Sequence, residues 1–213
     1  KALGDREVVR RQAPHRVRPL RFVLPWEPHL RPRWMLRAGL WLYDHLGRRS
    51  PAFPASRSLQ LPGDALGSWL APHLQQAFSY ADAQVDDARL VVLNALDAHE
   101  RGAKIFTHAA CDEVIRRAAH WEARIEQGGE QLTVRARGLV NAAGPWAARF
   151  ALRANRVAPH RALRLIKGSH IVVPRLFEHS CAYLFQHADG RVVFAIPYEE
   201  AFTLVGTDRK SVV

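Results

Sequence analysis

The chain has 213 residues, enough for one or two domains with a substantial buried core. Its 48% hydrophobic and 24% charged residues are ordinary for a globular protein, and no apolar run approaches the ~20 residues that span a bilayer. The formal net charge of +11 suggests nucleic-acid binding, but the aromatic residues follow apolar patterns and do not alternate with arginine as stacking platforms. Cys111 and Cys181 are too few for a disulfide framework. We therefore expect neither a nucleic-acid-binding protein nor a disulfide-stabilised one.

Residues 1–75 form a basic segment whose pattern is helical or irregular. A helix-like pattern covers Lys1–Ala13, and a short apolar strand is expected at Pro19–Pro25. A second helix, apolar almost all round, is expected at Trp34–Leu46. Residues 51–75 contain four prolines and are predicted to be an irregular connection.

Tryptophan and arginine are concentrated in this segment. Trp26, Trp34 and Trp41 accompany the twelve arginines of residues 1–60. Such a surface could lie on an anionic membrane, where each cation contributes about 1 kcal/mol. Alternatively, the second helix is buried and the arginines form a solvated fringe around it. The sequence leaves both interpretations open.

Residues 76–150 change from a helical pattern to strand patterns. Asp86 and Asp87 are expected to cap a helix that continues to His99 and stops at Gly102. No partner ligands lie at a spacing that would make this carboxylate pair a metal site. Strands are predicted after the helix at Ala103–Thr107, Cys111–Arg117, Trp121–Glu126 and Gln131–Arg137. Gly128-Gly129 is expected to form a hairpin turn between the last two.

A run of very small residues follows the next apolar pair. Leu139-Val140 fits a short buried strand, and Ala142-Ala-Gly144 then follows with almost no side chain. Small residues after a strand allow another backbone or a cofactor to approach the main chain closely. Pro145 is suited to the start of a helix at Trp146–Phe150.

The last part of the chain reads as a series of strands. In the strand expected at Arg164–Val173, alternation places Ile166, Gly168 and His170 on one face. Further strands, joined in part by a turn at residues 188–190, are predicted at Ala182–Gln186, Arg191–Tyr198 and Ala201–Gly206. These short strands and turn signals favour an antiparallel sheet.

Two motifs, Val140-Asn-Ala-Ala-Gly-Pro-Trp146 and Ile166-Lys-Gly-Ser-His170, carry a resemblance to a known family. Together with Val85-Asp-Asp-Ala-Arg89, they resemble the FAD-dependent, quinone-linked glycerol-3-phosphate dehydrogenases. The resemblance implies an α/β flavoenzyme fold of the D-amino-acid-oxidase-like superfamily. Residues 76–150 would be the latter part of a Rossmann-like FAD-binding domain, and residues 151–207 an antiparallel-sheet substrate domain. Residues 1–75 would contribute to the substrate-side cap.

The same resemblance implies which residues bind FAD and substrate. FAD would be contacted by the backbone of Cys111 and by Ala142, Ala143, Gly144, Pro145 and Trp146. The candidate catalytic base, or hydroxyl-orienting group, is His170, because imidazole can accept a proton near neutral pH. Lys167 and Arg164 are weaker candidates for phosphate binding. Lys167 lies on the opposite strand face unless Gly168 forms a bulge.

The activity implied is oxidation of sn-glycerol 3-phosphate to dihydroxyacetone phosphate, with electrons passed to quinone. The enzyme would be cytoplasmic and peripheral to the inner membrane, without a nucleic-acid partner, and a homodimer is one alternative for its assembly. Two other interpretations are an FAD-dependent oxidase acting on amines or amino acids, and a basic module that binds nucleic acid or a membrane surface. The Ile166–His170 motif argues against the oxidase, and a steep salt dependence of DNA binding would favour the basic module.

The sequence also leads to expectations about the missing glycine fingerprint and the last six residues. No Gly-x-Gly-x-x-Gly spacing occurs among the glycines, so we expect an inactive internal fragment that lacks the pyrophosphate-binding turn. The family has Gly-Thr-Thr-Asp where this chain continues from Gly206 and Thr207 into Asp208–Val213. This hexapeptide looks like a translated sequencing adapter, and we expect it not to belong to the natural protein.

Overall fold

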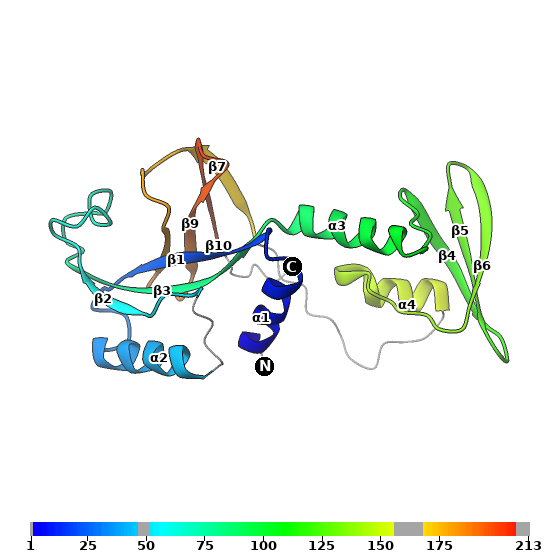
Figure 1. The fold of residues 1–213 in the computed structure, drawn as a ribbon, viewed down its shortest axis with the longest axis horizontal. Coiled ribbons are helices and arrows are strands. Elements are labelled where there is room, and N and C mark those ends of the chain that lie inside the picture. The colour runs from blue at the N-terminus through cyan, green and yellow to red at the C-terminus, as the bar shows by residue number, and fades with distance from the viewer. Residues whose placement is uncertain (1, 47–51, 156–167, 208–213) are drawn as a thin grey trace. The chain divides into compact units, whose positions relative to one another are not determined.

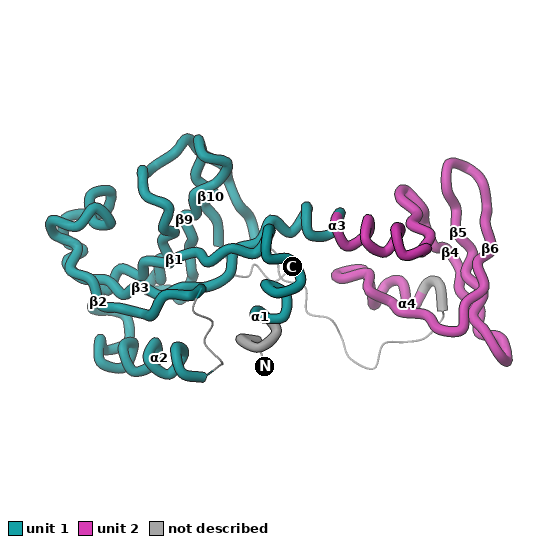
Figure 2. The backbone as a smooth tube through the Cα atoms, in the orientation of Figure 1, with its two compact units in different colours: residues 1–92, 166–212 teal, residues 93–165, 213 magenta. Residues whose placement is uncertain are grey.

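The computed structural model describes residues 2–46, 52–155 and 168–207 (Figure 1). The chain divides into two compact units (Figure 2). Unit 1 comprises residues 1–92 and 166–212, and unit 2 comprises residues 93–165 with residue 213. The domain boundaries expected after residues 75 and 150 remain a prediction.

Unit 1 is organised around a sheet in the order β2-β3-β1-β8-β9-β10-β7. Its neighbouring strands are antiparallel, except that β1 and β8 run parallel. The strands are β1 (Val17–Pro25), β2 (Arg57–Gln60), β3 (Gln76–Val85), β7 (His170–Pro174), β8 (Ala182–Gln186), β9 (Val192–Tyr198) and β10 (Phe202–Thr207). The first three come from residues 17–85 and the last four from residues 170–207. The sheet therefore joins segments that are remote in sequence.

The strands β8, β9 and β10 form the antiparallel arrangement that the sequence predicts. Gly190 has φ +79° in the turn between β8 and β9, where the His187 N–H donates to the Arg191 carbonyl at 2.8 Å. In this conformation glycine avoids the steric cost that a Cβ would bring. The expected strands and their hairpin turn are confirmed.

Two apolar clusters make the core of unit 1. One is centred on the fully buried Val23 and Tyr183, and includes Leu59 and Phe177. The other joins Leu24, Phe78 and Leu184. Leu59 belongs to β2, in the segment predicted to be irregular, so that prediction was wrong for Arg57–Gln60. The prolines of the segment lie outside these four residues, which leaves the backbone free to pair with β3.

Helices α1 (Ala2–Gln12) and α2 (Arg33–His45) also belong to unit 1. In α2, Leu36 and Leu40 pack against the second apolar cluster, whereas Trp34 is 70% exposed and Trp41 is 55% exposed. The interpretation of this helix as buried was wrong for the described residues. An α-helix buries only the stripe that faces its neighbour, and here the neighbour covers one side.

Unit 2 begins within α3 (Asp87–Glu100) and continues into a sheet in the order β4-β5-β6. Its strands are β4 (Ala109–Arg116), β5 (Trp121–Gln127) and β6 (Glu130–Ala136). The short helix η1 (Gly144–Trp146) leads into α4 (Ala147–Asn155), which packs against β4. The expected cap is confirmed, because the Arg89 N–H donates to the Asp86 carboxylate at 3.0 Å. Gly128 and Gly129 form the expected turn with positive φ.

Two predicted strands of unit 2 do not form. Ala103–Thr107 and Leu139-Val140 have no strand assignment and pair with no strand of the sheet. The expectation that the second of these is buried was wrong, since Val140 is 88% exposed. A strand requires a hydrogen-bonded neighbour, and the described residues offer none to either segment.

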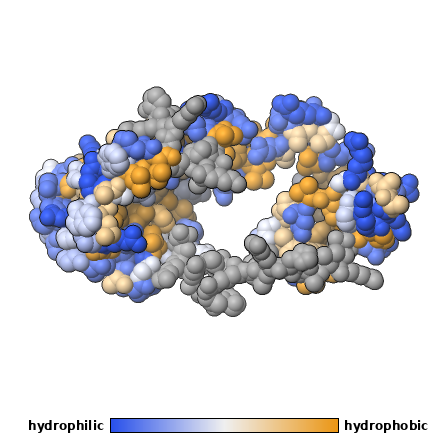
Figure 3. All heavy atoms as spheres, turned by 90° about the horizontal axis from the view of Figure 1, so that it is seen from below, coloured by the Kyte–Doolittle hydropathy of each residue, from blue (hydrophilic) through white to orange (hydrophobic). Residues whose placement is uncertain are grey.

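Hydrophobic surface is exposed on both units, as the orange areas of Figure 3 show. The large exposed apolar side chains of unit 1 include Trp34, Trp41 and Ile171, and those of unit 2 include Val140 and Trp146. No helix among the described residues has the length and apolar character needed to cross a membrane.

Candidate functional site

The small-residue motif of unit 2 forms an exposed turn. Gly144 has φ +54°, a conformation that costs a residue with a Cβ about 1–2 kcal/mol. The chain then enters η1, where the Trp146 N–H donates to the Ala143 carbonyl at 3.0 Å and Pro145 occupies the first turn. The expected helix start is therefore present. Ala142, Ala143, Gly144, Pro145 and Trp146 are all exposed.

Asn141 braces this turn from the side. Its amide nitrogen donates to the Ala147 carbonyl at 2.8 Å, and its side-chain oxygen accepts from the Ala143 N–H at 3.3 Å. One side chain thus connects the start of the turn to the start of α4. The sequence analysis quoted Asn141 as part of the motif but assigned it no role. The signal was available, because asparagine before small residues commonly closes a turn on its own backbone.

The space beside Gly144 is open. A Cβ built on this residue would meet no atom of the described residues within 4 Å. The turn therefore leaves room for a flat, bulky group to approach the main chain closely, as the expected contact with FAD would need. The residues present fit that cofactor at this position.

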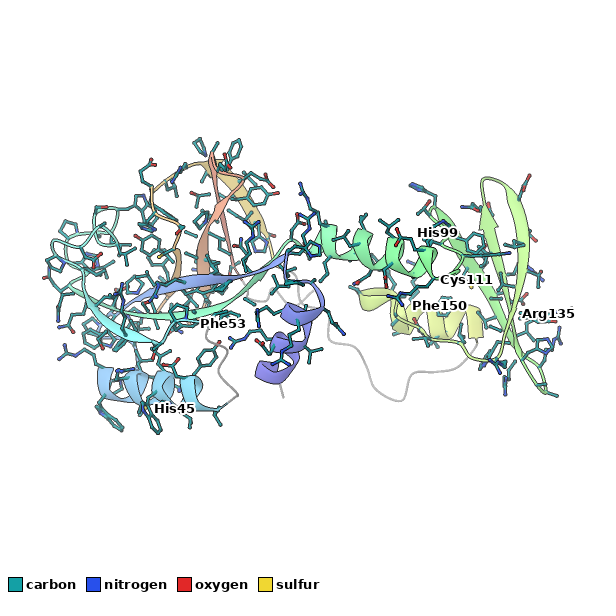
Figure 4. All side chains as sticks on the ribbon, viewed as in Figure 1. His45, Phe53, His99, Cys111, Arg135 and Phe150 are labelled. Carbon is teal, nitrogen blue, oxygen red and sulfur yellow. The ribbon has the colours of Figure 1, made fainter. Side chains whose placement is uncertain are left out.

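Cys111 lies on β4, the strand against which α4 packs (Figure 4). It is half-buried, and its Sγ lies 3.9 Å from the Glu113 carbonyl, next to a register shift of the β4–β5 ladder. Burial, with a smaller contribution from the charge of Asp112, raises the pKa of the Cys111 thiol. The thiol is therefore protonated near neutral pH and is a poor nucleophile. Any contact with a cofactor would use the backbone.

His170 begins β7 in unit 1 and lies opposite Gly206 of β10. His170 is exposed, whereas Gly206 is buried. A Cβ built on Gly206 would lie 2.0 Å from Cδ2 and 2.7 Å from Nε2 of His170. The imidazole thus lies directly over the backbone of Gly206. Sequence reasoning did not find this contact, because it depends on the pairing of two strands.

The residues before His170 also approach β10 closely. The Thr207 N–H donates to the Ser169 carbonyl at 3.3 Å. A Cβ on Gly168 would lie 2.9 Å from the Thr207 carbonyl oxygen, closer than real Cβ atoms come. Gly168 and Gly206 together permit the main chains to come near each other beside His170. The glycine of the Lys-Gly-Ser-His motif thus has a steric role in the strand pairing.

Three expectations fall on residues that the structure does not describe. Lys167 and Arg164, the candidates for phosphate binding, lie outside the described residues. The same holds for the suspected foreign tail, Asp208–Val213. Among the described residues, no group of three or more His, Cys, Asp or Glu side chains could hold a metal ion.

A family model described as "FAD dependent oxidoreductase" matches residues 2–212. The chain belongs to this family of FAD-dependent oxidoreductases. FAD is the cofactor of the family, and the expected resemblance and the mixed α/β fold with a mostly antiparallel sheet are confirmed.

Relatives within the FAD-dependent oxidoreductases match 97% of the chain. Glycerol-3-phosphate dehydrogenase of Pseudomonas aeruginosa is 51% identical, and 40% of its length is covered. Aerobic glycerol-3-phosphate dehydrogenase of Escherichia coli is 42% identical, with 41% of its length covered. D-erythritol 1-phosphate dehydrogenase of Brucella abortus is 45% identical, again with 41% covered. The chain therefore spans about 40% of the length of the curated relatives it matches.

A solved structure has the same fold. Glycerol-3-phosphate dehydrogenase from Bacillus halodurans, solved in complex with FAD, aligns with 98% of this chain and 38% of its own, with a TM-score of 0.71. Its sequence is 24% identical, so the likeness shows the fold alone.

Proposed function

We propose that the full-length protein carrying this chain oxidises sn-glycerol 3-phosphate to dihydroxyacetone phosphate with FAD and passes the electrons to a membrane quinone. The observation that carries the proposal is His170, an exposed imidazole on β7 that lies over the glycine of the facing strand. The names of the relatives that are 51% and 42% identical support this substrate.

His170 is the base in this reaction. Oxidation of the secondary alcohol removes a hydride from carbon and a proton from the hydroxyl oxygen, and bound FAD supplies the acceptor for the hydride. The His170 imidazole accepts the hydroxyl proton, since it is exposed and lies in the motif that resembles the substrate-facing strand of the family. The hydroxyl electrons then form the carbonyl of the product.

The turn of unit 2 holds the flavin nucleotide through its backbone. Ala142, Ala143, Gly144, Pro145 and Trp146 present an exposed main chain with no atom near the open side of Gly144. Asn141 keeps this turn in shape, and the backbone of Cys111 supplies a further contact on β4. Lys167 and Arg164 remain candidates to bind the substrate phosphate, because both are cationic and adjoin His170 in sequence.

The chemistry of the substrate can be tested with the full-length protein. Under anaerobic conditions, sn-glycerol 3-phosphate should bleach the flavin absorbance in a rapid mixing experiment. Glycerol should bleach it far more slowly, because it lacks the phosphate. Rapid bleaching by glycine or D-alanine, with none by glycerol 3-phosphate, would instead identify an amino-acid oxidase. Erythritol 1-phosphate is the necessary comparison, since one relative carries the name of a dehydrogenase for it.

Contact with an anionic membrane surface is part of the same proposal. Helix α2 exposes Trp34, Met35, Trp41 and Leu42. Arg33 in the first turn of α2 precedes the exposed Trp34 in sequence, and its guanidinium lies 5.4 Å from the centroid of the partly buried Trp26 ring. Aromatic side chains and cations of this kind favour the interface of an anionic bilayer.

Vesicle binding tests the membrane contact. The full-length protein should sediment with phosphatidylglycerol vesicles, and replacing Trp34 and Trp41 together by serine should weaken that binding. The matched control replaces Val91 and Val92 of α3, which are 66% and 64% exposed, by serine. Equal loss in both variants would remove the assignment to α2.

A further inference from the structure

We infer that Gly206 is a positioning residue for His170. Position 206 requires glycine, because the His170 imidazole occupies the place that a side chain at 206 would take. The inference rests on the proposed function for its catalytic consequence. The contact itself is a property of unit 1 and can be tested without substrate.

The geometry comes from the pairing of two strands. β10 and β7 are antiparallel, with Gly206 opposite His170 and Val205 opposite Ile171. A Cβ on Gly206 would lie 2.0 Å from Cδ2, 2.6 Å from Cγ and 2.7 Å from Nε2 of His170. Three ring atoms would be closer than van der Waals contact allows. Any other residue at 206 must move the imidazole.

The requirement for glycine does not come from the backbone conformation. Gly206 is not among the residues with positive φ, so its strand geometry would suit any residue. The glycines of turns, such as Gly190 with φ +79°, have a conformational reason that Gly206 lacks. The three atoms nearest to a Cβ built at 206 all belong to the His170 ring.

This contact restricts the imidazole while leaving it accessible. Gly206 is buried and supports one side of the ring, whereas His170 as a residue is exposed. A base acts only when its nitrogen is held within hydrogen-bond reach of the proton it takes. Displacing a reacting group by about 1 Å can cost about 10²-fold in rate.

A purely structural role would produce the same contact. Aromatic rings are known to cover glycines of a neighbouring strand and thereby to stabilise a sheet. The two roles differ in their consequences. A positioning role changes the rate of proton removal at unchanged flavin content, whereas a structural role changes only stability.

The first test is a kinetic double-mutant cycle in the full-length enzyme. Gly206→Ala should lower the rate of flavin reduction by glycerol 3-phosphate about 10²-fold, with FAD content retained. In the His170→Ala background, Gly206→Ala should have no further effect, because the group it displaces is gone. Gly39→Ala in α2 is the control, since a Cβ there meets nothing within 4 Å. An unchanged rate in Gly206→Ala, or additive losses in the double variant, would overturn the inference.

The second test needs neither FAD turnover nor substrate. Gly206→Ala should lower the melting temperature of the flavin-free full-length protein by a few degrees. Combining it with His170→Ala should remove most of that loss, because the methyl group then has room. If Gly206→Ala does not fold, recovery of folding in the double variant supports the contact, and failure of both refutes it. If glycerol 3-phosphate never bleaches the wild-type flavin, the proposed function fails, while this cycle still decides the contact.

Discussion

The two units present their candidate contacts in different ways. Unit 1 places a side chain, His170, on a sheet supported by two apolar clusters. Unit 2 presents backbone at residues 142–146, and among its described residues Val114 is the one buried apolar side chain. The difference matches the roles proposed for the two contacts. A proposed base requires rigid neighbours that hold it at a defined point, whereas a proposed backbone surface for a flat cofactor requires room and suitable dihedral angles.

The largest effect expected from this comparison is the loss of rate in His170→Ala. Removing a general base typically lowers the rate about 10²–10⁴-fold, here measured as anaerobic flavin reduction in the full-length enzyme. FAD content should remain unchanged, because the proposed flavin contacts, the backbone of Cys111 and of residues 142–146, do not include the His170 imidazole. His187→Ala, at an exposed histidine of the β8–β9 turn, is the matched control. If His170→Ala loses FAD as well as rate, the assignment of the base to unit 1 and of flavin binding to unit 2 is wrong.

The reverse effect is expected from Gly144→Val in unit 2. A β-branched residue at φ +54° is strained, and its methyl groups would enter the open space beside the turn. FAD affinity should fall at least about tenfold, given a strain of about 1–2 kcal/mol and the lost approach to the backbone. The rate per bound flavin should be retained.

Gly128→Val controls for the strain alone. Gly128 has φ +60° and also has no atom within 4 Å of a built Cβ, but it lies in the β5–β6 turn. Dialysis followed by flavin absorbance compares the two variants. Equal FAD loss in both would show that instability of unit 2, rather than contact at Gly144, controls retention.

A smaller effect is expected in the core of unit 1. The Tyr183 hydroxyl donates to the Leu66 carbonyl at 2.7 Å, and the Tyr183 side chain is fully buried. Tyr183→Phe should lower the free energy of unfolding by about 1 kcal/mol, because that carbonyl loses its donor. Tyr198→Phe, at a residue 42% exposed, should have a negligible effect in the same urea titration. FAD content should not change in either variant. A loss of flavin in Tyr183→Phe would show that FAD binding, proposed for residues 142–146, also depends on the core of unit 1.

The smallest effect concerns the pH dependence of the same cluster. The His179 ring stacks on the Phe177 ring with centroids 4.7 Å apart. Burial lowers the pKa of the His179 imidazole, opposed in part by hydrogen bonds to the backbone of Cys181 and of His179 itself and then by the charge of Asp64. The unfolded chain therefore binds a proton at a higher pH than the folded chain. The contribution of His179 to stability is complete above the ordinary imidazole pKa of about 6.5 and is lost as the pH falls through the lower folded pKa.

Urea titrations at several pH values between 5 and 8 can measure this contribution. The wild-type protein should lose stability as the pH falls over this range, and His179→Gln should lose less. An identical pH profile in the two proteins would show that His179 is not responsible. The effect is small because the imidazole is only half-buried.

Much of the fold followed from local sequence signals. The β8–β9 hairpin, the β5–β6 hairpin with its two glycines, and the Asp86 cap of α3 form as predicted. Each depends on residues close together in the chain, so turn geometry and capping chemistry suffice to predict it. The antiparallel character of the last strands was predictable for the same reason, and the two family motifs could be read directly in the sequence.

The errors concern burial and strand pairing over longer distances. Helix α2 is apolar almost all round but covers the sheet with only one stripe. Strand β2 forms because β3 offers it an edge, while Leu139-Val140 has no such neighbour among the described residues. Apolar composition shows that a residue can be buried, but only the neighbouring element decides whether it is.

The sequence by itself determined the family of this protein, its two motifs and the identity of the candidate base. Only the tertiary structure placed Gly206 beneath His170 and showed that Asn141 connects the turn at residues 142–146 to α4. Gly206 and His170 are separated by 35 intervening residues, and they meet because the register of β7 and β10 sets them opposite each other. Strand register is a property of the paired backbones, and a shift of one residue would have put a different side chain against the imidazole.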